Sequence, residues 1–512
     1  MTRLPLMIDL SGPAITAEER ELLAERRVAG VCLFGRNVTD RHQLADYVAE
    51  ARALAGDELV VGIDQEGGGV LRLLDVPFPP AAMALGAADD PVLTEEVAAA
   101  TGRALAAVGV NLDFAPVADV NSNPANPVIA DRSFGADPAL VARHVAAFVR
   151  GLQSAGVGAT LKHFPGHGDT SLDSHLDLPV VDRSLGELRA TELVPFRAGM
   201  AAGAAAVMSA HIVLPRLEPG VPATLSRRAM HALLREELGF EGLSVTDALD
   251  MKAVADRFEP GQAAVLALRA GVDVPLTLGP VTKHRSVLAA IDEALAAGGF
   301  GPDGLAGPLA RLAAFARAYP ARAEGGRFDA AVEAADRATM ARATRAGLVT
   351  LAGPLPELAP GDRVAVLANR TVRASAASQV SARPAEGLVE ELQRRGVQVA
   401  WLELPWGESI DPTPFLAGLS PLPRAVLYAS TSRTRVAEGE AVTARNAAEW
   451  ARHAGRGFVH VALWNPYSAE LVPGPALLAF GYRGTAAAAV VEALMGGGAS
   501  ARAPVPLRAL AK

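Results

Sequence analysis

The sequence VGATLKHFPGHGDTSLDSH, residues 157–175, begins with a short apolar run, ends that run on charged side chains and continues as a loop. Val157–Leu161 has the length and composition of a buried strand, and Lys162 and His163 follow at its end. Pro165 and two glycines exclude a regular helix, so the histidine-rich remainder is expected to be a loop. The same order, an apolar run and then polar side chains, recurs through the first half of the chain, and this recurrence decides the fold.

Eight such runs occur before residue 280, separated by segments of helical length. The runs are Leu4–Ile8, Gly30–Phe34, Leu59–Ile63, Val110–Phe114, Val157–Leu161, Ala204–Met208, Gly242–Val245 and Val272–Leu276. Seven of them end on or just before a polar residue, namely Asp9, Arg36, Asp64, Asp113, Lys162 with His163, His211 and Asp247. Strands that alternate with helices form parallel sheets, and eight repeats predict an α/β fold of the (β/α)8 TIM-barrel type, whose strand ends converge on one catalytic face. An open dinucleotide-binding sheet would instead carry a G-x-G-x-x-G turn after the first strand, and none is present.

Residues 282–345 read as helical and lead from the barrel to a second unit. Strand candidates recur there at Arg363–Ala368, Val397–Leu402, Ala425–Ala429, Phe458–Leu463 and Ala476–Phe480. Helical patterns separate most of these runs, which is typical of another α/β arrangement. We therefore expect the barrel to span residues 1–335 and a smaller α/β domain to span residues 346–512.

The overall composition excludes several classes of protein. The chain has 512 residues, of which 50% are hydrophobic and 20% are charged, as in ordinary globular proteins. The formal net charge of −8 comes without a Lys/Arg cluster, so we expect neither a nucleic-acid nor a membrane partner. Cys32 is the only cysteine, which excludes an internal disulfide and predicts a small buried side chain. The N-terminus lacks the apolar run of a signal peptide and no stretch approaches the roughly 18 apolar residues of a membrane helix, so we expect a cytoplasmic location.

The loop after the fifth strand carries the densest group of reactive side chains. Residues 162–175 contain three histidines, one lysine and two aspartates. Asp173 and His175 predict an acid/base dyad, because a nearby carboxylate favours the imidazolium and raises the pKa of histidine. A histidine that titrates near neutrality can first give and then take a proton. His167 is interpreted as a residue that supports the loop, and His163 taken alone also fits a buried core histidine.

Two aspartates at other strand ends are further candidates. From its position after the seventh strand, Asp247 is a nucleophile, an electrostatic stabiliser or a strand-end cap. Asp250 follows in the next turn and is expected to be a charge at a helix N-terminus. Asp64 precedes three consecutive glycines, Gly67–Gly69, that allow the backbone to turn closely, so its carboxylate either accepts from sugar hydroxyls or caps the turn.

These motifs resemble glycoside hydrolase family 3, in its two-domain β-N-acetylglucosaminidase (β-hexosaminidase) branch. The residues that carry the resemblance are 30–37 (GVCLFGRN), 111–120 (NLDFAPVADV), 132–135 (RSFG), 162–170 (KHFPGHGDT) with 173–175 (DSH), 208–212 (MSAHI), 239–251, 463–467 (LWNPY) and 487–506. The resemblance covers the barrel and extends into the second domain, for which it implies an αβα sandwich.

The resemblance also implies a role for individual residues. Asp247 is implied as the nucleophile of a covalent glycosyl-enzyme, and Asp173 with His175 as the acid/base dyad of a retaining exo-hydrolase. The substrate-binding residues that we expect are Asp64, Arg132, Lys162, His163 and His211. No metal and no other cofactor is expected. The implied substrate is a glycan or muropeptide with terminal β-linked N-acetylglucosamine, which places the enzyme in peptidoglycan recycling, and a monomer is the default state.

One position departs from the family pattern. The family usually reads Asp-Gln-Glu-Gly-Gly-Arg-Val, and Gly69 stands here in place of the arginine. Arg72 is a candidate for the arginine that the family also places nearby. We expect the change to alter the anchoring of the loop more than the chemistry. In the second domain, Trp406, Trp464 and Tyr467 are expected to pack rather than to contact substrate.

Four other readings remain open. A phosphorylase would use the same intermediate, because a histidine acid/base tolerates an incoming phosphate anion. A β-glucosidase of the same family is disfavoured, because that branch takes its acid/base carboxylate from the second domain. A metal-dependent barrel hydrolase could use His163, His167, Asp169 and His175 as ligands. A sugar-binding or scaffold protein on a decayed barrel would have lost Asp247 or the dyad, and all three are present.

Overall fold

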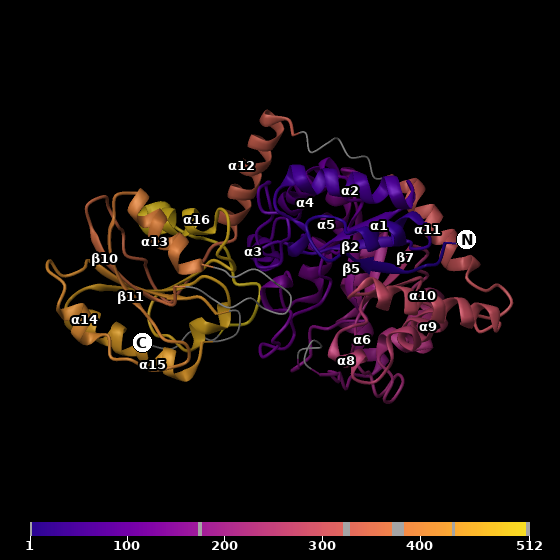
Figure 1. The fold of residues 1–512 in the computed structure, drawn as a ribbon. Coiled ribbons are helices and arrows are strands. Elements are labelled where there is room, and N and C mark those ends of the chain that lie inside the picture. Colours follow the sequence, from indigo (N-terminus) through magenta and orange to yellow (C-terminus); the bar gives the residue numbers. More distant parts are fainter. Residues whose placement is uncertain (1–2, 173–176, 321–327, 371–382, 433–435, 508–512) are drawn as a thin grey trace.

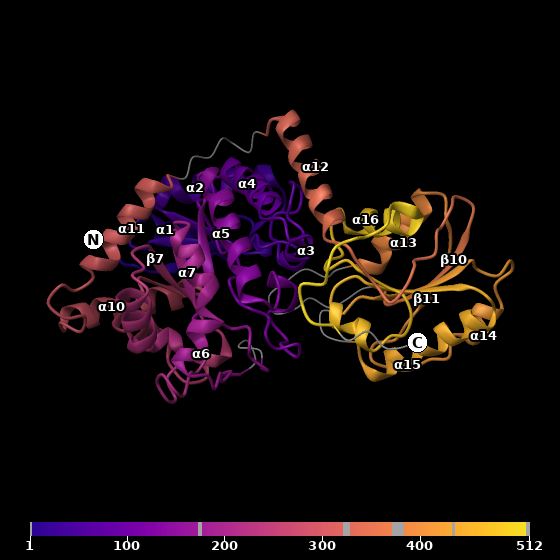
Figure 2. The same cartoon turned by 180° about the vertical axis from the view of Figure 1, so that it is seen from behind.

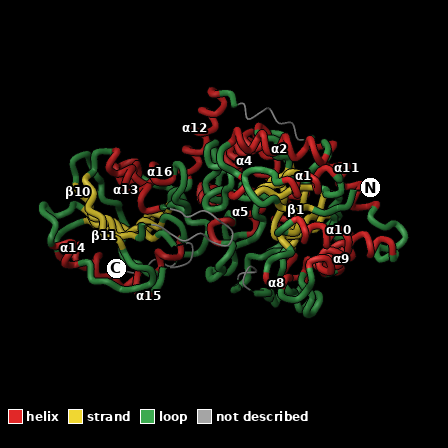
Figure 3. The backbone as a smooth tube through the Cα atoms, in the orientation of Figure 1, coloured by secondary structure: helices red, strands yellow, loops and turns green. Residues whose placement is uncertain are grey.

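Eight short parallel strands close into a barrel at the centre of the first domain (Figures 1 and 3). The strands are β1 (Met7–Asp9), β2 (Gly30–Leu33), β3 (Val60–Ile63), β4 (Leu112–Asp113), β5 (Gly158–Phe164), β6 (Ala206–Ser209), β7 (Leu243–Ala248) and β8 (Val274–Thr277). Each pairs with the next, and β1 pairs with β8 to complete the closure. The computed structural model describes residues 3–172, 177–320, 328–370, 383–432 and 436–507. The predicted TIM-type barrel is confirmed.

The strands are buried on both faces, which explains why they read as continuous apolar runs in the sequence. Every residue of β2, β3, β5 and β6 is buried. Inside the barrel, Met7, Phe114, Met208 and Val245 share one apolar cluster. Because this interior is filled, the polar residues at the strand ends are left at the carboxyl face of the barrel.

Helices surround the barrel and cover the outer face of its strands (Figure 2). They are α1 (Ala17–Ala24), α2 (Arg41–Ala55), α3 (Ala82–Ala88), α4 (Pro91–Ala107), α5 (Pro138–Ser154), α6 (Leu185–Ala190), α7 (Leu193–Ala201), the π-helical segment Arg228–Glu237, α8 (Lys252–Ala255), α9 (Pro260–Ala270), α10 (Val281–Ala296) and α11 (Ala306–Ala318). Among the described residues, no helix is both long and apolar enough to cross a membrane.

The second domain is built on a six-stranded sheet with the order β11-β10-β12-β13-β14-β9 (Figure 3). Its strands are β9 (Val349–Leu351), β10 (Arg363–Ala368), β11 (Gln398–Glu403), β12 (Ala425–Ser430), β13 (Gly457–Ala462) and β14 (Ala476–Leu478). Its helices are α13 (Pro384–Arg394), α14 (Thr413–Ala417), α15 (Glu438–His453) and α16 (Ala486–Glu492). Apolar side chains of α13 and α16 pack on one face of the sheet, and those of α14 and α15 pack on the other. This arrangement is the αβα sandwich that the resemblance implied.

Helix α12 (Ala330–Ala346) joins the two domains and lies between them in Figure 1. It packs against α3 and α4 of the barrel and against α16 of the second domain. Met340 and Ala343 are buried in this contact. The chain then enters β9, the antiparallel edge strand beside β14, which the sequence reading missed.

Candidate active site

A cavity of about 150 Å³ opens at the carboxyl end of the barrel, where catalytic sites of this fold lie. Its wall comes from strands β2 to β8 and the loops that follow them. The lining includes Cys32, Phe34, Asp64, Glu66, Val70, Arg72, Phe114, Val128, Arg132, Lys162, His163, His167, Met208, Asp247 and Met251. The structure therefore brings together five of the site residues expected from the sequence, which are Asp64, Arg132, Lys162, His163 and Asp247.

Asp64 lies just beyond β3 and is held by two cations. Lys162 donates from Nζ to its Oδ1 at 2.8 Å, and Arg72 donates to its Oδ2 at 2.9 Å. Burial alone would raise the pKa of Asp64, but Lys162 and Arg72 outweigh it and hold that pKa below its usual value. Asp64 is therefore an ionised acceptor at the cavity wall, and Arg72 supplies the ion pair that the change at Gly69 had put in doubt.

Glu66 was not singled out from the sequence, although it is the most heavily paired carboxylate of the site. Arg132 donates to both of its oxygens at 2.8 Å, in the bidentate geometry that arginine favours. Lys162 lies 2.5 Å from the same carboxylate. Burial opposes ionisation, but Arg132 and Lys162 lower the pKa of Glu66 well below its usual value. Glu66 thus fixes two of the expected substrate-binding cations and neutralises part of their charge.

Asp119, also missed from the sequence, positions the start of the histidine-rich loop. Its Oδ2 lies 2.7 Å from Nδ1 of His163, and its Oδ1 accepts from the backbone N–H of His167 at 2.6 Å. Burial would raise the pKa of Asp119, and His163 lowers it below its usual value. The second ring nitrogen of His163 lies 3.2 Å from Arg132. His163 is therefore oriented from both sides.

Asn126 ties the loop after β4 to the loop after β5. Its side-chain amide donates to the carbonyls of His167 at 2.9 Å and Gly168 at 3.0 Å, and its oxygen accepts from two backbone N–H groups of its own loop. His167 is buried, its Nδ1 lies 2.9 Å from Oγ1 of Thr170, and burial lowers its pKa to about 4. These contacts agree with the interpretation of His167 as a residue that supports the loop.

Asp247 is the fifth residue of β7 and is partly exposed into the cavity. Its Oδ1 accepts from the backbone N–H of Ala248 at 2.8 Å, which orients the carboxylate. Asp173 and His175, the expected acid/base dyad, lie outside the described residues. The described chain on either side ends at Leu172 and resumes at Asp177.

Two residues near Asp247 have contacts within the protein that the sequence did not indicate. His211 is fully buried and does not line the cavity; its Nδ1 lies 2.8 Å from Oγ1 of Thr224, and its Nε2 lies 2.9 Å from the carbonyl of Ala248. It therefore supports the backbone after Asp247 in this structure, because β6 has already ended and the imidazole turns toward β7. Asp250 is not the capping residue of the helix that follows. Its carboxylate pairs with Lys283 and accepts from the backbone N–H of Leu278, the residue after β8.

The remaining wall of the cavity is apolar, which the sequence did not indicate. Phe34, Val70, Phe114 and Met251 line the cavity together with the charged residues, and the guanidinium of Arg72 lies 5.9 Å from the centre of the Phe34 ring. Burial raises the pKa of the Cys32 thiol well above its usual value, so Cys32 is a neutral part of this wall rather than a nucleophile. A lining that combines charged and apolar side chains suits a sugar ring, which has hydroxyl edges and C–H faces.

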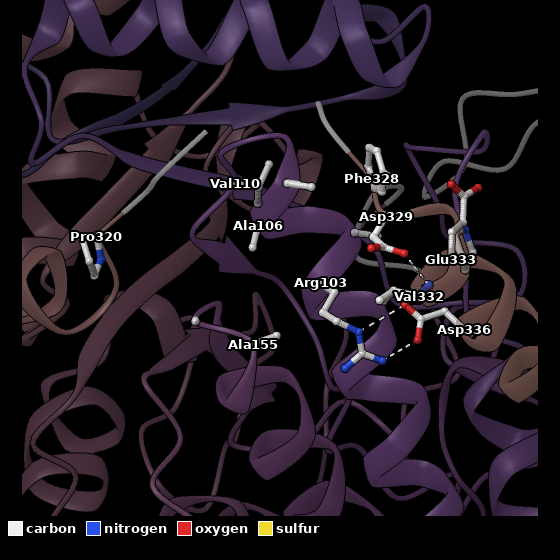
Figure 4. A pocket seen from close by; sticks show the side chains of 14 residues that line it. Arg103, Ala106, Val110, Ala155, Pro320, Phe328, Asp329, Val332, Glu333 and Asp336 are labelled. Atoms are coloured by element: carbon white, nitrogen blue, oxygen red, sulfur yellow. Dashed lines mark hydrogen bonds and ion pairs between the residues drawn. The ribbon is translucent and has the colours of Figure 1, made fainter. Parts of the chain in front are cut away.

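A larger cavity of about 560 Å³ lies at the other end of the barrel (Figure 4). It is bordered by Val110 and Ala155, which precede β4 and β5, and by the start of α12. Its carboxylates already have partners within the protein: Asp336 pairs with Arg103, Glu333 pairs with Arg41, and Asp329 caps α12. Among the residues that the structure describes, the carboxylates of this cavity thus serve ion pairs and a helix cap.

The candidate ligands of a metal site mostly have other partners. Among the described residues, no group of three or more histidine, cysteine or acidic side chains is arranged to hold a metal ion. His163 is bonded to Asp119, and Asp169 is bonded to Arg183 at 2.7 Å. The geometry of these residues therefore gives no support to the metal-dependent reading.

Comparison with known proteins adds to this geometry. The family model described as "Glycosyl hydrolase family 3 N terminal domain" matches residues 5–307. A "Beta-hexosaminidase" of Stenotrophomonas maltophilia (strain K279a) is 42% identical over 283 residues, which are 54% of this chain and 83% of that protein. A glycoside hydrolase family 3 beta-N-acetylglucosaminidase from Paenibacillus sp. str. FPU-7 is similar in structure, with a TM-score of 0.89, 31% identity and coverage of 98% of this chain and 97% of that one. NagZ from Neisseria gonorrhoeae, in complex with N-trifluoroacetyl-D-glucosamine, gives a TM-score of 0.57 at 31% identity over 67% of this chain and 99% of its own.

Proposed function

Because the chain belongs to glycosyl hydrolase family 3, we propose that it is a retaining exo-β-N-acetylglucosaminidase. The observation that carries the proposal is the cavity at the barrel's carboxyl end, whose lining includes Asp247 together with the paired group Asp64, Lys162, Arg132 and His163. The relatives named for hexosaminidase or N-acetylglucosaminidase activity support the choice of sugar.

The proposed reaction has two steps. Asp247 attacks the anomeric carbon, the bond from that carbon to the leaving oxygen breaks, and His175 gives its proton to the leaving oxygen. Water then attacks the same carbon, passes a proton to His175 and displaces Asp247 as a carboxylate. Two displacements at one carbon leave the product in the β configuration. Asp173 is proposed to hold His175 in the protonated form that the first step needs.

The ion-paired group is proposed to bind the hydroxyls of the terminal sugar. Asp64 offers carboxylate oxygens, whereas Arg132, Lys162 and His163 offer N–H groups, so a sugar hydroxyl can both donate and accept in this wall. The partners of these residues hold them in place before substrate arrives, which limits the cost of ordering on binding. His211 is proposed to act as a positioning residue through the carbonyl of Ala248.

The natural substrate that we propose is a muropeptide or another cell-wall fragment with a terminal β-linked N-acetylglucosamine, and the process is peptidoglycan recycling. The hydrolase is our first candidate for the reaction. Phosphate in place of water in the second step would make the protein a phosphorylase, and the product distinguishes the two.

The test compares wild type and Asp247→Ala on 4-nitrophenyl β-N-acetylglucosaminide and on the β-glucoside, each with and without phosphate. We expect wild type to release free N-acetylglucosamine from the first substrate and Asp247→Ala to lose this activity by at least 1,000-fold, of the order of the loss when a catalytic nucleophile is removed. Release of sugar phosphate only in the presence of phosphate would assign a phosphorylase. Cleavage of the glucoside alone, or an active Asp247→Ala variant, would overturn the proposal.

A further inference from the structure

Gly69 lies in the loop after β3, between two parts of the protein that leave it no room for a side chain. On the barrel side, the preceding glycines Gly67 and Gly68 have positive φ angles of 116° and 54°. A Cβ atom at Gly67 would lie 2.3 Å from the carbonyl oxygen of Pro80, and one at Gly68 would lie 2.7 Å from Cβ of Ala81. The two residues before Gly69 are therefore packed closely against Pro80 and Ala81 of the barrel domain.

On its other side, Gly69 contacts Trp464 of the second domain. A Cβ atom at Gly69 would lie 2.8 Å from Cζ2 of the indole, closer than real Cβ contacts allow. Trp464 is only 4% exposed, and its ring packs against Tyr482 at a centroid distance of 4.7 Å. The space that the family's arginine would need at position 69 is thus occupied by an aromatic side chain that is itself held in place.

The position of Gly69 is linked to the charged wall of the cavity through a short path. Val70 and Arg72, which line the cavity, follow directly in the chain. Oε1 of Gln65 accepts from the backbone N–H of Arg72 at 3.0 Å, and Arg72 in turn holds Asp64. A displacement of the backbone at Gly69 would therefore move the groups that orient Asp64.

The second domain also contacts the loop after β4, which carries Arg132. Asn121 donates to the hydroxyl of Tyr467 at 3.1 Å, and the backbone N–H of Ala136 donates to the carbonyl of Pro504 at 3.0 Å. Tyr467 lies in one buried apolar cluster with Met83 of α3. The loops after β3 and β4, which carry Asp64, Arg72 and Arg132, are therefore both supported by the second domain.

We propose that the second domain positions the sugar-binding loops of the barrel, and that the absence of a side chain at position 69 lets the loop after β3 lie against Trp464 with Asp64 and Arg72 in place. This inference rests on the proposed function, because it assigns the charged wall to sugar binding. Gly69 and Trp464 are positioning residues, since neither is placed against the reacting atoms. The second domain supplies no residue of the reaction in this proposal and instead sets the affinity for the substrate.

The test is a double-mutant cycle of Gly69→Ala, Trp464→Phe and the double variant, with kcat and KM measured on 4-nitrophenyl β-N-acetylglucosaminide. Phenylalanine keeps an aromatic ring beside Tyr482 but lacks the outer edge of the indole, where Cζ2 lies. We expect Gly69→Ala to raise KM at least tenfold because its methyl group must push the loop or the indole away. Trp464→Phe should stay within threefold of wild type, and the double variant should stay within threefold of Trp464→Phe.

Gly158→Ala is the matched control. Its Cβ atom would lie 2.7 Å from the ring of Phe315, but at the opposite end of β5 from Lys162. We expect it to lower the melting temperature about as much as Gly69→Ala and to leave KM within twofold of wild type. A purely structural role for the Gly69–Trp464 contact would give both alanine variants this behaviour.

The outcomes separate the two proposals. Wild type without activity on the N-acetylglucosaminide would overturn the proposed function, whereas active wild type with unchanged KM in Gly69→Ala would overturn only the positioning role. A double variant as impaired as Gly69→Ala would show that Trp464 is not the partner. The same double-mutant cycle, measured by melting temperature, tests the contact independently of activity. If the shifts of the two single variants simply add in the double variant, Gly69 and Trp464 are not coupled and the proposed contact is contradicted.

Discussion

Glu66→Gln is predicted to destabilise the barrel strongly, because Glu66 lies between two buried cations. Arg132 makes a bidentate contact with its carboxylate and Lys162 lies 2.5 Å away, with all three side chains at most 7% exposed. Glutamine keeps the shape but removes the charge and turns an N–H group toward a cation. Breaking a buried ion pair by changing one partner costs about 3–5 kcal/mol. Since 1 kcal/mol shifts the melting temperature by about 2–4 °C in a domain of about 150–250 residues and by less in a larger one, the melting temperature should fall by several degrees.

Scanning calorimetry at pH 7 measures this loss, with Glu95→Gln as the control. Glu95 also pairs with an arginine, Arg150 at 2.8 Å, but its side chain is 43% exposed. An exposed pair contributes about 0–1 kcal/mol, so the control should change the melting temperature little. If Glu66→Gln loses no more stability than Glu95→Gln, the buried network does not hold the site as we argue.

The stability that Glu66 contributes should depend on pH. Because the pKa of Glu66 is lower in the folded protein than its usual value of 4.5, the unfolded chain binds more protons as the pH falls. The contribution of Glu66 is therefore fully present above about pH 4.5 and is lost as the pH falls toward the folded pKa. The difference between wild type and Glu66→Gln should shrink on acidification below pH 4.5.

Three further predictions concern other buried groups. Burial raises the pKa of Asp113 to about 8, so the wild-type protein loses stability as the pH rises from about 4 to 8. In urea unfolding, the stability of Asp113→Asn relative to wild type should therefore increase over that range. A stability difference that does not change with pH would contradict this. Asn126→Ala removes the side-chain donor of the Gly168 carbonyl and one of the two donors of the His167 carbonyl, the other being Oγ1 of Thr170, which should cost about 1–3 kcal/mol in urea unfolding and lower kcat/KM at least tenfold; unchanged stability would exclude the tie between the two loops. Burial raises the pKa of Glu192 to about 7, so its charge destabilises the fold only at higher pH. The melting temperature of Glu192→Gln should therefore match that of wild type at pH 5 and exceed it at pH 9. Equal melting temperatures at pH 9 would refute the raised pKa of Glu192.

The barrel was predictable because its strands are buried on both faces. Each of the eight predicted runs overlaps an observed strand, with ends displaced by up to three residues, since an apolar run does not show where the ladder of hydrogen bonds begins. Strand β9 was not predictable in the same way. Its three residues follow α12 almost directly, and only their pairing with β14 makes them a strand.

The site was predictable where a residue follows a strand end and not where it acts through a distant partner. Asp64 directly follows β3, Lys162 lies near the end of β5 and Asp247 is the next-to-last residue of β7. The barrel alone therefore brings them together. Glu66 meets Arg132 across 66 positions of sequence, and nothing local marks that pair. The same limit explains His211, whose imidazole turns to Thr224 and Ala248 although the residue follows a strand like the others.

Asp247 is proposed to form a covalent bond to the sugar in the first step of the reaction. The direct measurement is mass spectrometry of the protein after incubation with a 5-fluoro-β-N-acetylglucosaminyl fluoride, whose second fluorine slows the release of the glycosyl-enzyme. We predict one added sugar per chain, mapped by peptide fragmentation to Asp247 and absent in Asp247→Ala. An adduct on another carboxylate, or turnover of this reagent with no adduct at any time, would contradict the account.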